Sequence, residues 1–183
     1  MTGSTLNMHY TIADPKTFGI SEYEPVLPIY HSGQPEDRKE HCSDLLHRLD
    51  RIDPDRLSPE NAYTYRLLHR SLENDLALAD FPYYNEPLSP SSGMQSQLPV
   101  LLAEYTFRTK RDVTDYLALL DQIDDYFASL LLYEQEKAAA GFFMPACSSE
   151  KVRKQCDTIV TTEELAQGTH FLQTTFEDRL SEL

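Results

Sequence analysis

Residues 109–141 read TKRDVTDYLALLDQIDDYFASLLLYEQEKAAAG, and this stretch decides the fold class. Its apolar residues recur every three or four positions, which places them on one face of a helix. Thr109 has the side chain of an N-cap residue, and Gly141 suits the position just after a helix. The stretch therefore predicts one continuous helix, roughly 45 Å long at 1.5 Å per residue, as the central element of a bundle. The predicted apolar face comprises Val113, Tyr116, Leu117, Leu120, Ile123, Phe127, Leu130 and Leu131.

Two earlier segments, residues 35–52 and 58–79, have the same helical spacing of apolar residues. Ser58 is a favourable N-cap, and Pro59 suits the first helical position because its missing N–H is not needed there. Asp53-Pro54 ends the first segment. Because the link between the two segments is short, they predict an antiparallel pair of helices.

Shorter segments suggest further helices. The apolar run over residues 97–105 is compatible with a helix if Pro99 lies in its first turn, where proline is tolerated. Another helix is expected to open at Ser148 or Ser149.

Near the C-terminus, Thr161 and Glu164 have the spacing of a capping box, and Gly168 closes that short turn. Residues 172–183 are amphipathic at helical spacing. No Gly, Asn or Pro marks a C-cap, so we expect the chain to be cut inside or just after a helix.

The N-terminus has a different period. Leu6, Met8, Tyr10 and Ile12 alternate with Asn7, His9 and Thr11, which is typical of a half-buried strand. The nearby partner candidate, residues 26–30, contains Pro28, which restricts it to a sheet edge or bulge. The expected fold is therefore mainly α: a single domain over residues 1–183, a bundle of about six helices with one long central helix and a short N-terminal β element.

The net charge limits the classes of partner. Sixteen Lys and Arg against thirty Asp and Glu give a net charge of −14, which repels nucleic acid and anionic membrane surfaces. We therefore expect no nucleic-acid partner. The longest nearly apolar stretch, residues 138–147, is far shorter than the ~20 residues that span a bilayer, so no membrane-spanning segment is expected. Residues 1–10 lack the parts of a signal peptide, but a removed signal would leave the same sequence, so the compartment stays open.

The histidines do not have the spacing of a catalytic metal site. A helical zinc hydrolase needs His-Glu-x-x-His, and no histidine here precedes a glutamate. His69 stands four residues before Glu73, and we favour a surface hydrogen bond over a metal edge for this pair. We therefore expect no catalytic residue, no cofactor-binding residue and no metal ligand in this chain. The histidines are His9, His31, His41, His47, His69 and His170.

The cysteines Cys42, Cys147 and Cys156 are odd in number and have no metal-ligand spacing, so we expect buried or idle thiols.

The segment 81–93 keeps neither the helical spacing nor the strand alternation of apolar residues, which predicts a long loop. Long loops inside compact domains are often functional, because they are exposed and variable. Its aromatic and amide side chains, with those just after it, suit contact with a substrate or with another domain. The alternative, which we favour, is that Phe81, Tyr83 and Leu88 plug the open end of the bundle. The expected contact residues are Tyr83, Tyr84, Asn85, Gln95 and Gln97.

Several blocks resemble a known family. Residues 6–15 (LNMHYTIADP) with 18–20 (FGI) are similar to the opening of bacterial proteins in the domain-of-unknown-function 885 family. Three later blocks follow in the family's order and spacing, and the Gln-x-Gln-Leu-Pro stretch is the most specific. These blocks are EPLSP at 86–90, GMQSQLPVLLAEY at 93–105, and FRT at 107–109 leading into DYLALL at 115–120.

The resemblance implies a role in a larger protein. Family members are longer and similar to zinc metallopeptidases of the gluzincin type, with a His-Glu-x-x-His helix in the C-terminal half. The resemblance implies that this chain is the N-terminal region of such a protein and that zinc belongs to the missing C-terminal part. Many relatives are exported or lipid-anchored, so the same location is expected for the full-length protein. No metal ligand of the family is carried onto a residue here.

Two functions from different classes follow as expectations. In the first, the chain is the non-catalytic wall or lid of a substrate cleft in a zinc-dependent, peptidase-like hydrolase. Its partners would be the C-terminal catalytic half of the same protein and a peptide substrate. In the alternative, it is a self-contained acidic helical module that docks a protein partner.

Overall fold

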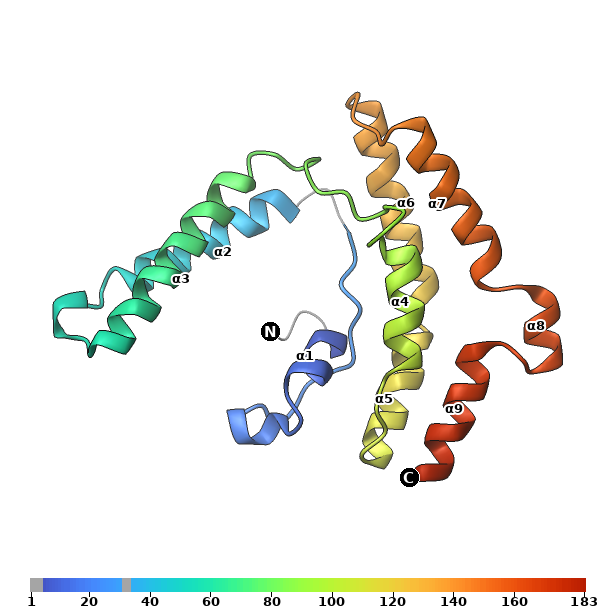
Figure 1. Cartoon of the computed structure of the whole chain (residues 1–183). Coiled ribbons are helices and arrows are strands. Elements are labelled where there is room, and N and C mark those ends of the chain that lie inside the picture. Colours follow the sequence, from blue (N-terminus) through green and yellow to red (C-terminus); the bar gives the residue numbers. More distant parts are fainter. Residues whose placement is uncertain (1–4, 31–33) are drawn as a thin grey trace. The chain divides into compact units, whose positions relative to one another are not determined.

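The computed structural model describes residues 5–30 and 34–183 (Figure 1). Within these ranges the chain forms nine α-helices and two 3-10 turns, with no strand. The expected six-helix bundle with a β element is therefore wrong in its β element and in its helix number. The elements are α1 (Thr5–Thr11), η1 (Pro15–Phe18), α2 (Gln34–Leu49), η2 (Pro54–Arg56), α3 (Pro59–Leu78), α4 (Met94–Ala103), α5 (Lys110–Leu120), α6 (Ile123–Ala139), α7 (Ala146–Ile159), α8 (Thr162–Gln167) and α9 (Phe171–Glu182).

The predicted N-terminal strand is helix α1. Leu6, Met8 and Ile12 are buried, as an alternating pattern would have them, but so is His9, while Tyr10 is 42% exposed. Residues 5, 8, 9 and 12 share one face of a helix, and this face packs inward. A run of four alternating apolar residues was too short to distinguish the two periods.

The predicted long helix is broken into α5 and α6 around Gln122. The side chain of Gln122 donates to the carbonyl oxygens of Pro25 (2.9 Å) and Ala118 (2.8 Å). Its Oε1 accepts from the amide of Leu27 at 3.0 Å. These bonds tie the extended segment before Tyr30 to the helix junction, and glutamine is not a residue that marks a helix end in sequence. The expectation of one continuous helix is therefore wrong.

The chain divides into two compact units. Unit 1 comprises residues 1–30 and 86–183, and unit 2 comprises residues 31–85.

Unit 2 is a hairpin of α2 and α3 (Figure 1). Ser58 caps α3 by accepting from the amide of Asn61, and Pro59 is the first helical residue, which confirms both predictions. Lys39 and Asp80 form an exposed ion pair of 2.6 Å. Among the described residues of this unit, the buried side chains are Cys42 and Ala79.

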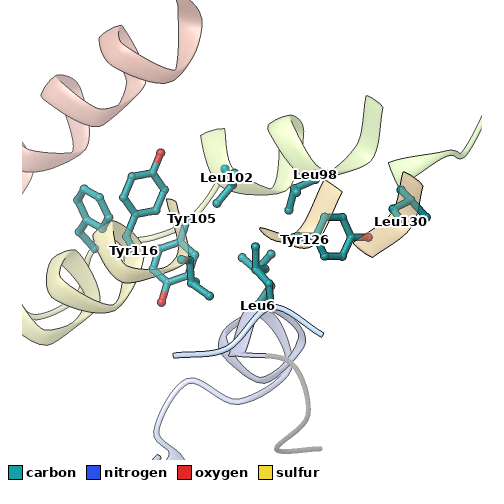
Figure 2. Close-up of a cluster of buried hydrophobic side chains, with 10 residues drawn as sticks. Leu6, Leu98, Leu102, Tyr105, Tyr116, Tyr126 and Leu130 are labelled. Carbon is teal, nitrogen blue, oxygen red and sulfur yellow. The ribbon is translucent and has the colours of Figure 1, made fainter. Parts of the chain in front are cut away.

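Unit 1 has an apolar core built from helices that lie far apart in sequence. Figure 2 shows Leu6 reaching from α1 toward Leu98 and Leu102 of α4. Tyr105 and Tyr116 extend the same cluster, and both are 1% exposed. Helix α4 also contacts α7 and α9, so it is the element around which the unit packs.

Helix α4 begins earlier than the sequence predicts. It starts at Met94, so Pro99 lies inside the helix rather than in its first turn. Proline lacks the N–H that would bond four residues back and normally weakens a helix interior. Here the proline is buried in the core, where packing outweighs the lost bond.

The caps of the later helices follow the sequence. Thr109 and Asp112 form a capping box at the start of α5, and Thr161 accepts from the amide of Glu164 at the start of α8. Gly141 and Gly168 adopt φ angles of 86° and 68°. These left-handed values reverse the chain after α6 and α8, and a Cβ would strain them. Helix α7 begins at Ala146, slightly before the predicted serines.

Candidate functional site

The predicted contact residues fall in both units. Tyr83, Tyr84 and Asn85 belong to unit 2, whereas Gln95 and Gln97 belong to unit 1. They therefore do not form one site within a single unit. Tyr84 is 81% exposed.

Gln95 is a buried structural residue. Its Nε2 donates to the carbonyl oxygen of Ser89 at 2.7 Å and to Oε1 of Gln155 at 2.9 Å. Gln155 in turn donates to the carbonyl oxygen of Pro90 at 2.9 Å. The two amides fasten the loop before α4 to α7, and Gln95 is only 2% exposed. Gln97, two residues along α4, is exposed.

The proposed plug is divided as well. Leu88 is partly buried against the core of unit 1, whereas Phe81, in unit 2, is 62% exposed.

A cluster of polar side chains surrounds the buried ring of His9. Its ring stacks on Tyr105 with centroids 3.7 Å apart. Nη1 of Arg108 lies 3.4 Å from Nε2, which must accept because a guanidinium only donates. Asp112 lies 3.8 Å from Nδ1. Burial, followed by the Arg108 charge, lowers the pKa of His9, so a neutral ring is favoured. With His9 7% exposed, this cluster holds α1 against α5 and offers little access to a ligand.

A second buried cluster joins Lys137 to two carboxylates. Nζ of Lys137 lies 2.7 Å from Oε2 of Glu86 and 4.0 Å from Oε2 of Glu134. Neither carboxylate oxygen of Glu134 has a hydrogen-bond partner among the described residues. Burial raises the pKa of Glu134, because the charged form loses its hydration. This cluster anchors the entry to α4 on α6.

A cavity with a volume of about 330 Å³ lies on the surface of unit 1. We call it the groove. Helix α5 supplies one wall, and the end of α7 with α8 and α9 supplies the other. Its lining residues are Tyr116, Leu117, Leu120, Val160, Leu165, His170, Leu172, Gln173, Phe176 and Glu177.

Aromatic packing fixes the base of the groove. The rings of Tyr116 and Phe176 stack with centroids 5.7 Å apart and an interplanar angle of 24°. Arg179, one turn beyond Phe176, donates to the carbonyl oxygens of Leu102 and Tyr105. Its guanidinium also lies 5.0 Å from the Tyr116 ring centroid. These contacts hold α9 against α5 and the end of α4.

The histidine of the groove has a structural role. His170 is 2% exposed, and its Nε2 lies 2.9 Å from the carbonyl oxygen of Ile159. Its Nδ1 accepts from the amide of Leu172 at 3.3 Å, so Nε2 carries the proton. Both nitrogens are thus used to cap α9 and to hold the end of α7.

The rim of the groove is apolar and open. Leu117, Val160 and Leu165 are 47%, 42% and 46% exposed. Such a surface suits the binding of apolar side chains, because burying them removes apolar area from water. The groove can bind and orient a ligand but does not bring an acid and a base together at a reacting bond.

His69 is partly exposed and lies within ion-pair distance of two carboxylates, whereas a hydrogen bond to Glu73 stays a prediction. Its Nδ1 lies 3.5 Å from Glu73, and its Nε2 lies 3.3 Å from Asp50. Over residues 5–30 and 34–183, no three His, Cys, Asp or Glu side chains gather in a way that could hold a metal ion. His31 lies outside the described residues. Cys42 is buried, and Cys147 and Cys156 are exposed free thiols.

Sequence reasoning missed the groove. The sequence predicts Leu117 and Leu120 on an apolar helix face and Leu172 in an amphipathic segment, but which of these side chains stay uncovered depends on how α5 and α9 pack. Val160 lies at the end of α7, and Leu165 lies in the short helix α8. Hydrophobic periodicity is a weak signal over such short segments.

In the part of the chain that the structure describes, no helix has the length and apolar character needed to cross a membrane.

Comparison with curated proteins gives no match, and comparison with solved structures gives none either. The family model described as "Bacterial protein of unknown function (DUF885)" matches residues 16–182. This match covers most of the sequence and agrees with the blocks at 18–20, 86–90 and 93–105, so the chain belongs to the DUF885 family.

Proposed function

We propose that this chain is a non-catalytic helical region that forms a wall or lid of the substrate cleft in a zinc-dependent, peptidase-like hydrolase. The observation that carries the proposal is the groove, which is an open apolar surface. Its one lining histidine, His170, uses both ring nitrogens in contacts with the backbone, so neither is free for catalysis. Family membership and the resemblance to zinc peptidases support the same role. Within such an enzyme, the groove would hold a side chain of an extended peptide.

The described residues do not fit a zinc site, because no ligand cluster is formed among them. The proposal therefore assigns zinc and the catalytic residues to the C-terminal half of a longer protein, and this chain contributes binding and orientation. Exposed Tyr84 and Gln97 stay predicted contacts with that half or with the substrate.

The proposal is tested on the purified chain with a fluorescein-labelled peptide that carries one Phe among Gly and Ser residues. We expect anisotropy to report binding, mass spectrometry to report no cleavage, and zinc analysis after dialysis to report no stoichiometric metal. Leu117→Gln should weaken binding several-fold, because it places an amide on the apolar rim. Leu131→Gln is the matched control, since Leu131 is 60% exposed on α6 and outside the groove. Stoichiometric zinc with peptide cleavage by this chain alone would contradict the proposal, and so would binding that Leu117→Gln leaves unchanged.

The alternative, a module that docks a protein partner, is favoured by unit 2. Tyr63, Leu67 and Leu68 on α3 are 58%, 54% and 50% exposed. A pair of helices with so few fully buried side chains suits a partner that covers its exposed apolar residues. Reading the gene beyond Leu183 separates the two functions. A continuing frame with His-Glu-x-x-His supports the hydrolase, whereas a stop codon supports the module.

A further inference from the structure

We infer that the groove selects peptides in which a bulky apolar residue is followed or preceded by Lys or Arg. This inference rests on the proposed function and adds the class of peptide to it.

The lining of the groove carries one charged residue, and that residue is acidic. Glu177 is exposed on α9, one turn after Gln173, on the same side of the helix. Exposed acidic residues also directly follow or precede lining residues in the sequence, at Asp121 and Glu164. No Lys or Arg is adjacent in sequence to any lining residue.

The chain as a whole adds to this local charge. Its net charge is −14, so the field over an exposed surface attracts cations. At the groove the nearest basic residue of α9, Arg179, is already bonded to two carbonyl oxygens and packed against Tyr116. A cationic side chain beside Glu177 would therefore meet a carboxylate, and an acidic side chain would be repelled.

The size of the groove limits what it can hold. Small-molecule and cofactor pockets span about 300–1,000 Å³, so a volume of about 330 Å³ lies at the lower end. One or two apolar side chains fit this space, and a peptide backbone can run along the open rim formed by Leu117 and Leu165. The apolar side chain would supply burial and the neighbouring cation would supply selectivity.

The test compares three labelled peptides that differ at two positions: Phe-Lys, Phe-Glu and Ala-Lys, each in the same Gly-Ser background. We expect Phe-Lys to bind at least tenfold more tightly than either of the others. The preference for Lys over Glu should shrink when NaCl is raised from ~50 to ~500 mM, because salt screens exposed charges.

Two charge-reversal variants test whether Glu177 causes the preference for Lys over Glu in the peptide. Glu177→Lys should remove the preference for Lys or reverse it, while binding of Phe-containing peptides persists. Glu150→Lys is the matched control, because it makes the same charge change at an exposed position of α7 outside the groove. Circular dichroism of both variants should match that of the parent chain.

Several results would overturn the inferred preference for apolar-basic peptides. Equal binding of Phe-Lys and Phe-Glu, or a loss of preference in Glu150→Lys as well, would overturn the inference and leave the proposed function standing. If no peptide binds, the proposed function fails with it. If sedimentation shows a dimer that Leu117→Gln dissociates, the groove is occupied by a second copy, and the inference is wrong.

Discussion

Gly93, at the start of α4, shows how closely the loop before this helix is packed. A Cβ at this position would lie 2.0 Å from Oε1 of Gln95 and 2.2 Å from the amide nitrogen of Ser89. The backbone contact cannot move without breaking the turn that Gln95 holds. We expect Gly93→Ala to lower the free energy of unfolding by roughly 1–3 kcal/mol in urea titrations.

Gln97→Ala is the control for Gly93→Ala. Gln97 is exposed on the same helix, so its truncation should change stability by less than about 0.5 kcal/mol. Equal stability of Gly93→Ala and the parent chain would show that this loop is looser than its contacts indicate.

Glu134 makes stability depend on pH. Its pKa is raised above the ordinary value of 4.5, so the folded chain binds this proton more tightly than the unfolded chain does. The contribution of Glu134 to stability therefore falls as pH rises from 4.5 through the folded-state pKa. We expect Glu134→Gln to stabilise the protein by on the order of 1 kcal/mol above that pKa, because it removes a buried charge without hydrogen-bond partners.

The stabilisation by Glu134→Gln should disappear below pH 4.5, where both states of the parent chain are protonated. Urea unfolding at several pH values measures this difference. Glu136→Gln, a partly buried neighbour on α6, should give a smaller effect. A pH-independent difference between Glu134→Gln and the parent would argue against the charge as its cause.

At the scale of elements, Gln122 explains the junction between α5 and α6. We expect Gln122→Ala to lower the free energy of unfolding by about 2–4 kcal/mol, because three hydrogen bonds of roughly 1 kcal/mol each are lost and the Leu27 amide loses its acceptor. Hydrogen exchange of that amide should accelerate. Gln135→Ala, exposed on α6, should be nearly neutral. If both variants unfold alike, the junction has another cause.

The helix ends were predictable where a local signal exists. These signals act within a few residues, and the structure has each of them in its predicted place: Ser58, Thr109, Thr161, Gly141 and Gly168. The break at Gln122 was not predictable, because its bonds reach Pro25 and Leu27 from a distant part of the sequence.

At the N-terminus, by contrast, a local sequence pattern is present but predicts the wrong secondary structure. Its few alternating residues suggested a strand, whereas burial of His9 and exposure of Tyr10 follow the helical face. The polar neighbours that make His9 acceptable inside, Arg108 and Asp112, are supplied by another part of the chain. The period of a short segment therefore does not determine its structure without the partners it packs against.

At the scale of the whole molecule, the two units should differ in stability. Unit 2 buries only Cys42 and Ala79 among its described residues, whereas α4, α5 and α6 share a continuous core. We expect amides of α3 to exchange at least about tenfold faster than those of α5 after correction for intrinsic rates, because hairpin opening exposes little apolar area. Hydrogen exchange read by mass spectrometry tests this. Equal protection of α3 and α5 would mean that the units unfold together.

The candidate site was the least predictable feature. The sequence pointed to a tyrosine-rich loop, whose residues fall in both units, and Gln95 is used for packing. The groove depends on which parts of several apolar helix faces stay uncovered after packing, and this follows only from the complete arrangement of unit 1.

The position of Arg179 has a thermodynamic consequence for any molecule held against Phe176. Both residues belong to α9, and the arginine closes the final turn of α4 through its bond to Leu102. A peptide that restricts the motion of α9 would restrict that turn as well, and by thermodynamic linkage each restriction would then favour the other by the same free energy. A bound peptide would be reported by slower solvent exchange at the end of α4, although it touches no residue of that helix.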